Sequence, residues 1–520
     1  MKKRIALLLV LIFLAVTILL SCGNDDAQAR NLQKLCKVWG FAKYTHQVFL
    51  LGLKDWDNEL FELIPVILSA KENEVNDILY EWFIGLGDDG YENVPAETET
   101  DEKNLRYMAD KSWITTEYLG EPLAAILSRF KVIPDINRAN APVSFDNLNN
   151  SVFSNEKPYK NMDYKDNGYR LLGLFRLWNA LEYYYPYLDI IDGDWSELLL
   201  KHIPMMLNGT DKQSYESTLA SLAAKTDDAH IGFSGESINE RYKQALLRNF
   251  IPSPTLSHVL LENNIGLINP SKLRTGEIHG IMKDFAGTDG LIVDFRQYPS
   301  DFLPYSLAQY LVDEHQPFAF MSNPLAAVPG VFEDNAPIYS GRFAGDFEGQ
   351  RQALLDLYKN DLEEARQYYL SLNENKRKEL RVQYLIKYDV DIGHSLDEFM
   401  EIYIESLIKQ FINIESYYYD KKVVLIMDEM TMSQPEFTIM SLRNGSNVTV
   451  IGRNSIGADG NVIFLPLPGG IRMSYTGLGV YYPDGGQTQR IGLSPDIYIK
   501  QTTKDTDELM EAAVQFILGN

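Results

Sequence analysis

A serine between a predicted strand and a predicted helix is the first candidate for chemistry in this chain. The apolar run Val423–Met427 predicts a buried strand, Glu436–Leu442 predicts a helix, and Ser433 lies between them. Backbone N–H groups and the positive end of the helix dipole at such a turn can stabilise a developing oxyanion, which suits a serine nucleophile in acyl transfer. A serine before a helix is also typical of a simple N-cap, and spacing alone favours that interpretation.

Further motifs around this serine follow one another in a distinctive order. They are Gly290–Pro299 (GLIVDFRQYP), Thr431–Glu436 (TMSQPE), Gly452, Gly457–Gly460 (GADG) and Gly492–Asp496 (GLSPD). Together they resemble the C-terminal-processing, or tail-specific, serine peptidases (serine peptidase family 41), over residues 264–338 and 421–499. The resemblance implies an α/β catalytic core with ClpP/crotonase-like layers of strands and helices. It also implies a serine-type endopeptidase that works through an acyl-enzyme, with neither a metal nor another cofactor.

The general base implied by this resemblance is a histidine. The better-known branch of the family uses a lysine in the loop after the next strand, where this chain has Ala458. The bacterial branch similar to the tricorn core peptidase uses a histidine upstream of the strand layer, and Asp228-Ala229-His230 lies in that place. Because the ordinary pKa of histidine is near neutrality, His230 can accept a serine proton without the burial that a lysine base requires. A purely structural histidine is the alternative.

The third member of the catalytic set stays open at this point. Gln489 stands where the histidine branch has an acidic residue, and an amide stabilises an imidazolium less than a carboxylate does. Asp228, beside the histidine, and Glu436, one helical turn past the serine, are the other candidate orienting residues. The sequence assigns none of the three.

The oxyanion hole implied by the resemblance consists of backbone N–H groups. One belongs to Gln434, and the other to the loop after Pro299, where Ser300-Asp301 replaces the family's usual pair of glycines. The N–H groups survive this replacement, whereas the backbone freedom of glycine does not. We therefore expect the hole to be built from Gln434 and from Ser300 or Asp301.

Two helical segments of similar sequence precede the predicted core. Pairs of residues 139 positions apart stay in register without a gap: Trp39 with Trp178, Tyr44 with Tyr183, Asp55-Trp56 with Asp194-Trp195, Leu60 with Leu199, Ile64 with Ile203, Pro65 with Pro204 and Leu68 with Leu207. Apolar residues recur at helical spacing in both segments, which predicts a duplicated helical hairpin module. We expect the aromatic residues to form the core of each module, and a ligand cage is the alternative.

The domain boundaries follow from the same patterns. Short β-branched runs at 264–268, 290–295, 423–427 and 447–451 predict an α/β core, and a capping box at Ser395–Glu398 within a helical pattern predicts a helical insertion. We expect a signal peptide over 1–21, a tether over 22–30, the first helical module over 31–146, a linker over 147–166, the second module with His230 over 167–232, the peptidase core over 258–346 and 420–520, and the helical insertion over 347–419.

The N-terminal residues predict export from the cytoplasm. Lys2–Arg4 gives a positive start, Ile5–Leu20 is an apolar run, and Leu19–Cys22 (LLSC) is similar to the bacterial lipoprotein signal. Lipid on Cys22 would anchor the protein to the bacterial cell envelope, on its periplasmic or its surface face. An uncleaved anchor helix is the alternative.

The composition narrows the set of partners. A formal net charge of −24 with dispersed basic residues would repel a phosphate backbone, so nucleic acid is not an expected partner. The expected partners are a peptide or protein substrate and, through Cys22, a membrane. One rival is a catalytically weak or inactive ligand-binding lipoprotein on the same scaffold, suggested by Gln489 and by Ser300-Asp301. Another is an interaction protein that assembles through the helical modules.

Overall fold

The chain forms two compact units, which are described separately below. The computed structural model describes residues 26–87, 104–130, 132–134, 136–146, 148–248, 252–343, 347–388, 395–412, 417–502 and 506–519. The first unit combines residues up to Lys243 with Met321–Asn335 and Gly460–Val480, and the second combines Gln244–Phe320, Ala336–Asp459 and Tyr481–Asn520. Residues 460–480, which the sequence placed in the peptidase core, thus group with the helical segments. The predicted signal peptide and Cys22 lie outside the described residues.

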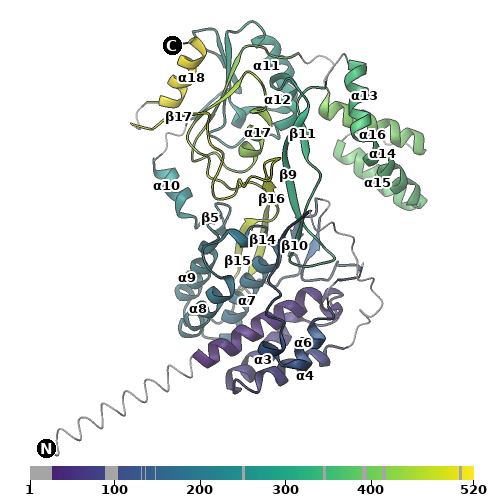
Figure 1. The fold of residues 1–520 in the computed structure, drawn as a ribbon, viewed down its shortest axis with the longest axis vertical. Helices are drawn as coiled ribbons and strands as arrows, with labels where there is room; N and C mark the ends of the chain where they lie inside the picture. Colours follow the sequence, from purple (N-terminus) through teal and green to yellow (C-terminus); the bar gives the residue numbers. More distant parts are fainter. Residues whose placement is uncertain are drawn as a thin grey trace, which may run out of the picture. The chain divides into compact units, whose positions relative to one another are not determined.

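A six-stranded sheet is the centre of the second unit (Figure 1). Its order is β17 (Ile497–Tyr498), β13 (Val448–Gly452), β12 (Lys422–Met427), β8 (Gly290–Asp294), β7 (Ile265–Ile268) and β6 (His258–Leu260). All neighbours pair in parallel except β6 and β7, which are antiparallel. The four strands predicted from β-branched runs are confirmed to within a residue or two. Because parallel strands end at one edge of a sheet, the loops after β8 and β12 meet there.

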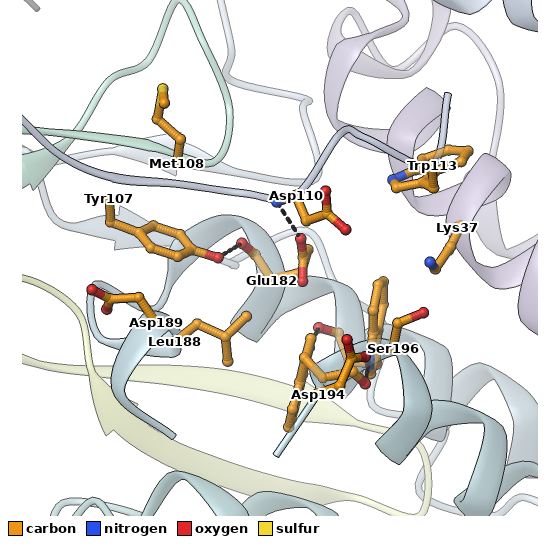
Figure 2. Close-up of a pocket in the computed structure, with 12 residues that line it drawn as sticks. Lys37, Tyr107, Met108, Asp110, Trp113, Glu182, Leu188, Asp189, Asp194 and Ser196 are labelled. Atoms are coloured by element: carbon orange, nitrogen blue, oxygen red, sulfur yellow. Dashed lines mark hydrogen bonds between the residues drawn. The ribbon is translucent and has the colours of Figure 1, made fainter. Parts of the chain in front are cut away.

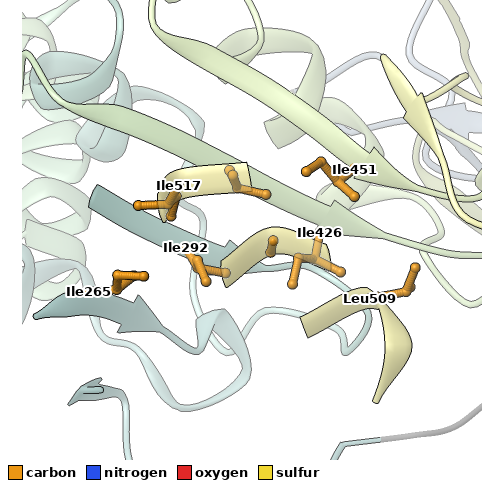
Figure 3. Close-up of a cluster of buried hydrophobic side chains, with 8 residues drawn as sticks. Ile265, Ile292, Ile426, Ile451, Leu509 and Ile517 are labelled. Carbon is orange, nitrogen blue, oxygen red and sulfur yellow. The ribbon is translucent and has the colours of Figure 1, made fainter. Parts of the chain in front are cut away.

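Apolar side chains of this sheet pack against the C-terminal helix. Figure 3 shows Ile292, Ile426 and Ile451 of the strands facing Leu509 and Ile517 of α18 (Glu508–Leu518). The other helices beside the sheet are α11 (Ile278–Phe285), α12 (Pro304–Leu311) and α17 (Gln434–Leu442). Continuous apolar runs such as that of β12 suit strands that are buried on both faces. The sheet therefore supplies a rigid base for the loops at its carboxyl edge.

The predicted insertion is helical. It contains α13 (Phe347–Leu357), α14 (Lys359–Ser371), α15 (Glu374–Tyr388) and α16 (Leu396–Phe411). The predicted capping box starts α16, since Ser395 Oγ accepts from the Glu398 N–H at 3.1 Å and the Ser395 N–H donates to the Glu398 carboxylate at 3.0 Å. The rings of Tyr369 and Phe399 stack at 4.6 Å and tie α14 to α16.

The first unit is mainly helical. A helix over 26–45 is followed by α2 (Gln47–Leu50), α3 (Trp56–Ser69), α4 (Val75–Gly85), α5 (Thr116–Leu119), α6 (Glu121–Leu127), α7 (Asn167–Tyr184), α8 (Trp195–Asn208) and α9 (Lys212–Ala223). α10 (Glu240–Arg248) continues from this unit into the second. None of the helices in the described ranges combines the length and apolar character needed to cross a membrane.

Short sheets complete the first unit. One has the order β14 (Val462–Leu467), β15 (Ile471–Thr476), β4 (Gly232–Phe233) and β5 (Glu236–Ser237), and another pairs β2 (Ser144–Phe145) with β3 (Ser151–Val152). β1 (Leu105–Met108) pairs with β10 (Val331–Asp334), which pairs with the end of β9 (Gln316–Pro324). The start of β9 pairs with β11 (Ile338–Ser340) in the second unit. β16 (Gly479–Tyr481) also pairs with β9. The pairing of β15 with β4 brings Thr476 beside the segment that contains His230.

The two helical segments share local geometry. Trp39 Nε1 donates to the Trp56 carbonyl at 2.8 Å, and Trp178 Nε1 donates to the Trp195 carbonyl at 2.9 Å. α3 and α8 each begin at the second tryptophan of these pairs, have 14 residues and are N-capped by the preceding aspartate. A proline lies at the same internal position of each helix.

Candidate active site

Ser433 occupies a strained backbone conformation at the start of α17. It is the N-cap residue, with φ 68° and ψ −125°, and Pro435 follows in the first turn. A positive φ is uncommon for a residue with a side chain and costs of order 1–3 kcal/mol, so surrounding contacts must hold it. The side chain is half-buried. The simple N-cap prediction does not account for this backbone, because an ordinary N-cap residue lies in the β region.

A buried carboxylate holds this turn in place. Glu436 is fully buried, and its Oε2 accepts from the backbone N–H groups of Ser433 at 2.9 Å and Ala458 at 3.1 Å. Its Oε1 accepts from the Gly457 N–H at 2.9 Å and from the Ser455 hydroxyl. Burial raises the pKa of Glu436, against the effect of these hydrogen bonds. Glu436 therefore joins the serine turn to the loop where another branch of the family has its lysine.

The loop after β8 is tied to the start of α17. The Asp301 carbonyl accepts from the Gln434 side-chain amide, and the Asp301 carboxylate accepts from the Thr275 N–H at 2.9 Å. The Ser300 N–H donates to the Pro270 carbonyl at 3.0 Å, so it is already engaged. Within the described ranges, the N–H groups of Asp301 and Gln434 have no such partner. These two are therefore the donors available to an oxyanion.

His230 lies in the first unit and is held by a relay of side chains. Its Nδ1 is 2.9 Å from Thr476 Oγ1, which donates to Asp228 Oδ1 at 2.9 Å. Asp228 also accepts from the Thr476 N–H and the His230 N–H, each at 2.9 Å. All three residues are buried.

This relay fixes the tautomer of the imidazole. The one hydroxyl proton of Thr476 goes to Asp228, so Thr476 Oγ1 must accept its other hydrogen bond from His230 Nδ1–H. The lone pair then lies on Nε2, the atom that a general base needs. Burial lowers the pKa of His230, and the charge of Asp228 opposes this only in part. The imidazole is thus neutral at neutral pH.

The three candidate orienting residues have different surroundings. Asp228 supports His230 through Thr476, whereas Glu436 supports the backbone of Ser433 in the other unit. Gln489 is fully buried, and neither its amide oxygen nor its amide nitrogen has a hydrogen-bond partner among the described residues. Thr476 was not predicted, because it lies 246 positions from His230 and no local motif marks it.

No group of three or more histidine, cysteine or acidic residues suited to a metal ion occurs in the described part of the chain. The chemistry available at these positions is that of a hydroxyl, an imidazole and backbone N–H groups. Those groups suffice for acyl transfer.

The match to one protein family agrees with this chemistry. Residues 355–499, which include Ser433, match the model of peptidase family S41. No curated protein matches the chain. Among solved structures, a candidate peptidase from Parabacteroides merdae is 15% identical, with 69% of this chain and 98% of that chain covered and a TM-score of 0.45. Mature CPAF complexed with lactacystin is 13% identical, with 68% of this chain and 99% of that chain covered and a TM-score of 0.41. The photosystem II D1 C-terminal processing protease is 10% identical, with 68% of this chain and 97% of that chain covered and a TM-score of 0.35. Over residues 355–499, the family match confirms the resemblance to peptidase family S41 that the motifs around Ser433 predicted.

Proposed function

We propose that this protein is a serine endopeptidase of the C-terminal-processing type that cleaves peptide or protein substrates, with Ser433 as nucleophile and His230 as general base. The observation that carries the proposal is the strained turn of Ser433 within the S41 match. Its N–H donates to the buried Glu436, whose carboxylate also accepts from Ser455, Gly457 and Ala458 in the neighbouring loop. Strain that is maintained by so many contacts is typical of a catalytic position.

The proposed reaction has two steps. His230 Nε2 takes the Ser433 hydroxyl proton as Oγ bonds to the peptide carbonyl carbon, and the imidazolium then gives this proton to the leaving amine as the C–N bond breaks. Water, deprotonated by the same imidazole, hydrolyses the acyl-enzyme. The N–H groups of Asp301 and Gln434 would stabilise the oxyanion in both steps.

The relay behind His230 has a clear part in this mechanism. As the imidazole gains a proton, its Nδ1–H still donates to Thr476, whose hydroxyl passes the interaction to the Asp228 carboxylate. Asp228 thereby stabilises the imidazolium through one intervening hydroxyl. This arrangement supplies the carboxylate that is missing at Gln489.

Peptide hydrolysis tests the proposal. Native protein and Ser433→Ala are assayed with a library of internally quenched peptides, and Ser371→Ala, an exposed serine of the insertion, is the matched control. We expect hydrolysis by the native protein and the control and none by Ser433→Ala. Binding of peptides without hydrolysis by the native protein would favour the inactive ligand-binding alternative.

We also propose that the protein is exported and lipid-anchored through Cys22, on the basis of its N-terminal sequence. Mass spectrometry of the mature N-terminus tests this. A diacylglyceryl group on an N-terminal Cys22 supports the anchor, and an intact Met1 contradicts it.

We further propose that the two helical segments are copies of one module. Their constant offset of 139 positions and the matching hydrogen bonds of Trp39 and Trp178 support this. In an experimental structure the two segments should superpose with α3 on α8. Unlike positions of these helices would contradict the duplication.

A further inference from the structure

The first helical segment encloses one of its own lysines in an aromatic site. The Lys43 ammonium lies 4.7 Å from the ring centroid of Trp39 and 5.8 Å from that of Trp56. It forms an ion pair with Glu156, and both side chains are fully buried. Cations within about 6 Å of an indole ring are stabilised by its quadrupole. The pair of tryptophans and a carboxylate therefore hold an ammonium group inside this segment.

The second segment has the same tryptophans without the lysine. Trp178 and Trp195 correspond to Trp39 and Trp56, and their rings stack at 6.2 Å between centroids. At the same offset of 139 positions, Lys43 corresponds to Glu182. An acidic residue thus replaces the cation.

A cavity lies at this place in the first unit (Figure 2). It has a volume of about 230 Å³. Its aromatic walls are formed by Trp178, Trp195, Trp113 and Tyr107. Figure 2 shows Glu182 between Tyr107 and Asp110. The cavity is large enough for a small organic group.

The charges around the cavity are unbalanced. Its lining includes the carboxylates of Glu182, Asp110, Asp189 and Asp194 but only the ammonium of Lys37. Glu182 is 5% exposed, and its one side-chain hydrogen bond among the described residues comes from the Asp110 N–H at 3.0 Å. No cation of the described chain forms an ion pair with it. Burial raises the pKa of Glu182 to about 8, against the opposing effects of the Asp110 N–H and the nearby Lys37 ammonium.

We infer that this cavity binds an organic cation, an alkylammonium or guanidinium group, against Trp178 and Trp195 with Glu182 as its counter-ion. The ligand group would take the part that the Lys43 ammonium has in the first segment. A free amine and a basic side chain of a peptide share this chemistry. The site lies in the first unit, and the inference does not depend on the activity of Ser433.

Calorimetry and tryptophan fluorescence with the full mature protein test this inference. The probes are butylammonium, butylguanidinium and their uncharged analogue butanol. We expect a 1:1 complex with the cations that is at least tenfold tighter than with butanol. Equal affinity for charged and uncharged probes in the native protein would overturn the inference, whatever the variants do.

Variants locate the site. Glu182→Gln keeps the shape and removes the charge, and it should weaken cation binding at least tenfold, whereas Glu197→Gln, an exposed carboxylate on α8, should leave it within twofold. Each variant is first checked for an unchanged melting temperature. Unaltered binding by a folded Glu182→Gln would place the cation elsewhere. Ser433→Ala should bind the probes like the native protein, which separates this test from that of the peptidase.

The two sources of the cation are distinguished by peptides. Nα-acetyl-lysine methylamide and a lysine-containing hexapeptide are compared with butylammonium in the same titration. Tighter binding of the hexapeptide would identify a basic peptide side chain as the ligand. Tighter binding of butylammonium would identify a free amine.

Discussion

The nucleophile and the base of the proposed peptidase are positioned by different means. Ser433 is held through its backbone, since its N–H and two N–H groups of the following loop converge on Glu436. His230 is held through its ring, by the hydroxyl of Thr476. The contacts of Glu436 fix the position of the Ser433 backbone. The contact of Thr476 fixes the proton of His230 on Nδ1. Substitutions around Ser433 and around His230 should therefore differ in their effects on activity, stability and pH dependence.

Loss of the base should have the largest effect. We expect His230→Ala to lower kcat for peptide hydrolysis by about 10³-fold or more, with KM much less affected, as for a triad member. The half-buried His258 is the matched control, and His258→Ala should retain activity. Steady-state kinetics on folded proteins measure this. Equal kcat in the native protein and His230→Ala would remove His230 from the mechanism.

Loss of the buried carboxylate should damage both stability and activity. Glu436→Gln places an amide NH₂ against at least one of four donors, so we expect the free energy of unfolding to fall by about 3 kcal/mol. kcat should fall by about tenfold to a hundredfold as the Ser433 turn relaxes. Chemical denaturation and kinetics are compared with Glu511→Gln, an exposed position on α18. Full stability in Glu436→Gln would show that the turn does not depend on Glu436.

Loss of the Thr476 hydroxyl, which links His230 to Asp228, should lower activity. Thr476→Val keeps the side-chain shape but removes the acceptor of the Nδ1–H, so we expect kcat to fall by about tenfold to a hundredfold. Thr476→Ser retains the hydroxyl and should recover most of the activity. Failure of the serine variant to recover activity would indicate that Thr476 acts by packing and not by its hydroxyl.

The pH dependence should be the smallest effect. Because burial lowers the pKa of His230, the acid limb of kcat/KM should have its midpoint below the ordinary histidine value of 6.5. The same shift means that the unfolded chain binds the extra proton more readily, so stability is lost as pH falls through 6.5 toward the folded pKa. In Thr476→Val the midpoint should move lower still. A midpoint above 6.5 in the native protein would contradict this account of burial.

The strands and the turn that contains Ser433 could be predicted because their signals are local. The apolar run of β12 and the motif around Ser433 are contiguous in sequence, and a helix start is a short-range pattern. Thr476 could not be predicted, since it reaches His230 only through the pairing of β15 with β4. The role of Glu436 was left open for a related reason: its partners at 455–458 come together only when β12 and β13 pair.

The cavity beside Glu182 is a second feature that could not be predicted from the sequence. Sequence comparison aligned the tryptophans of the two segments and predicted both pairs as core. All four tryptophans are buried, as predicted. Trp39 and Trp56 enclose Lys43, whereas Trp178 and Trp195 also line a cavity. The replacement of Lys43 by Glu182 in the aligned register is the signal that distinguishes the two segments.

Covalent labelling tests the central claim most directly. A fluorophosphonate probe forms a stable bond with a serine only where the hydroxyl is activated and an oxyanion is stabilised. The native protein is treated with the probe, digested and analysed by mass spectrometry, with Ser433→Ala and heat-denatured protein as controls. We predict that the native protein carries one label, on Ser433, and that neither control is labelled. A folded native protein that is not labelled at Ser433 would contradict its role as the nucleophile.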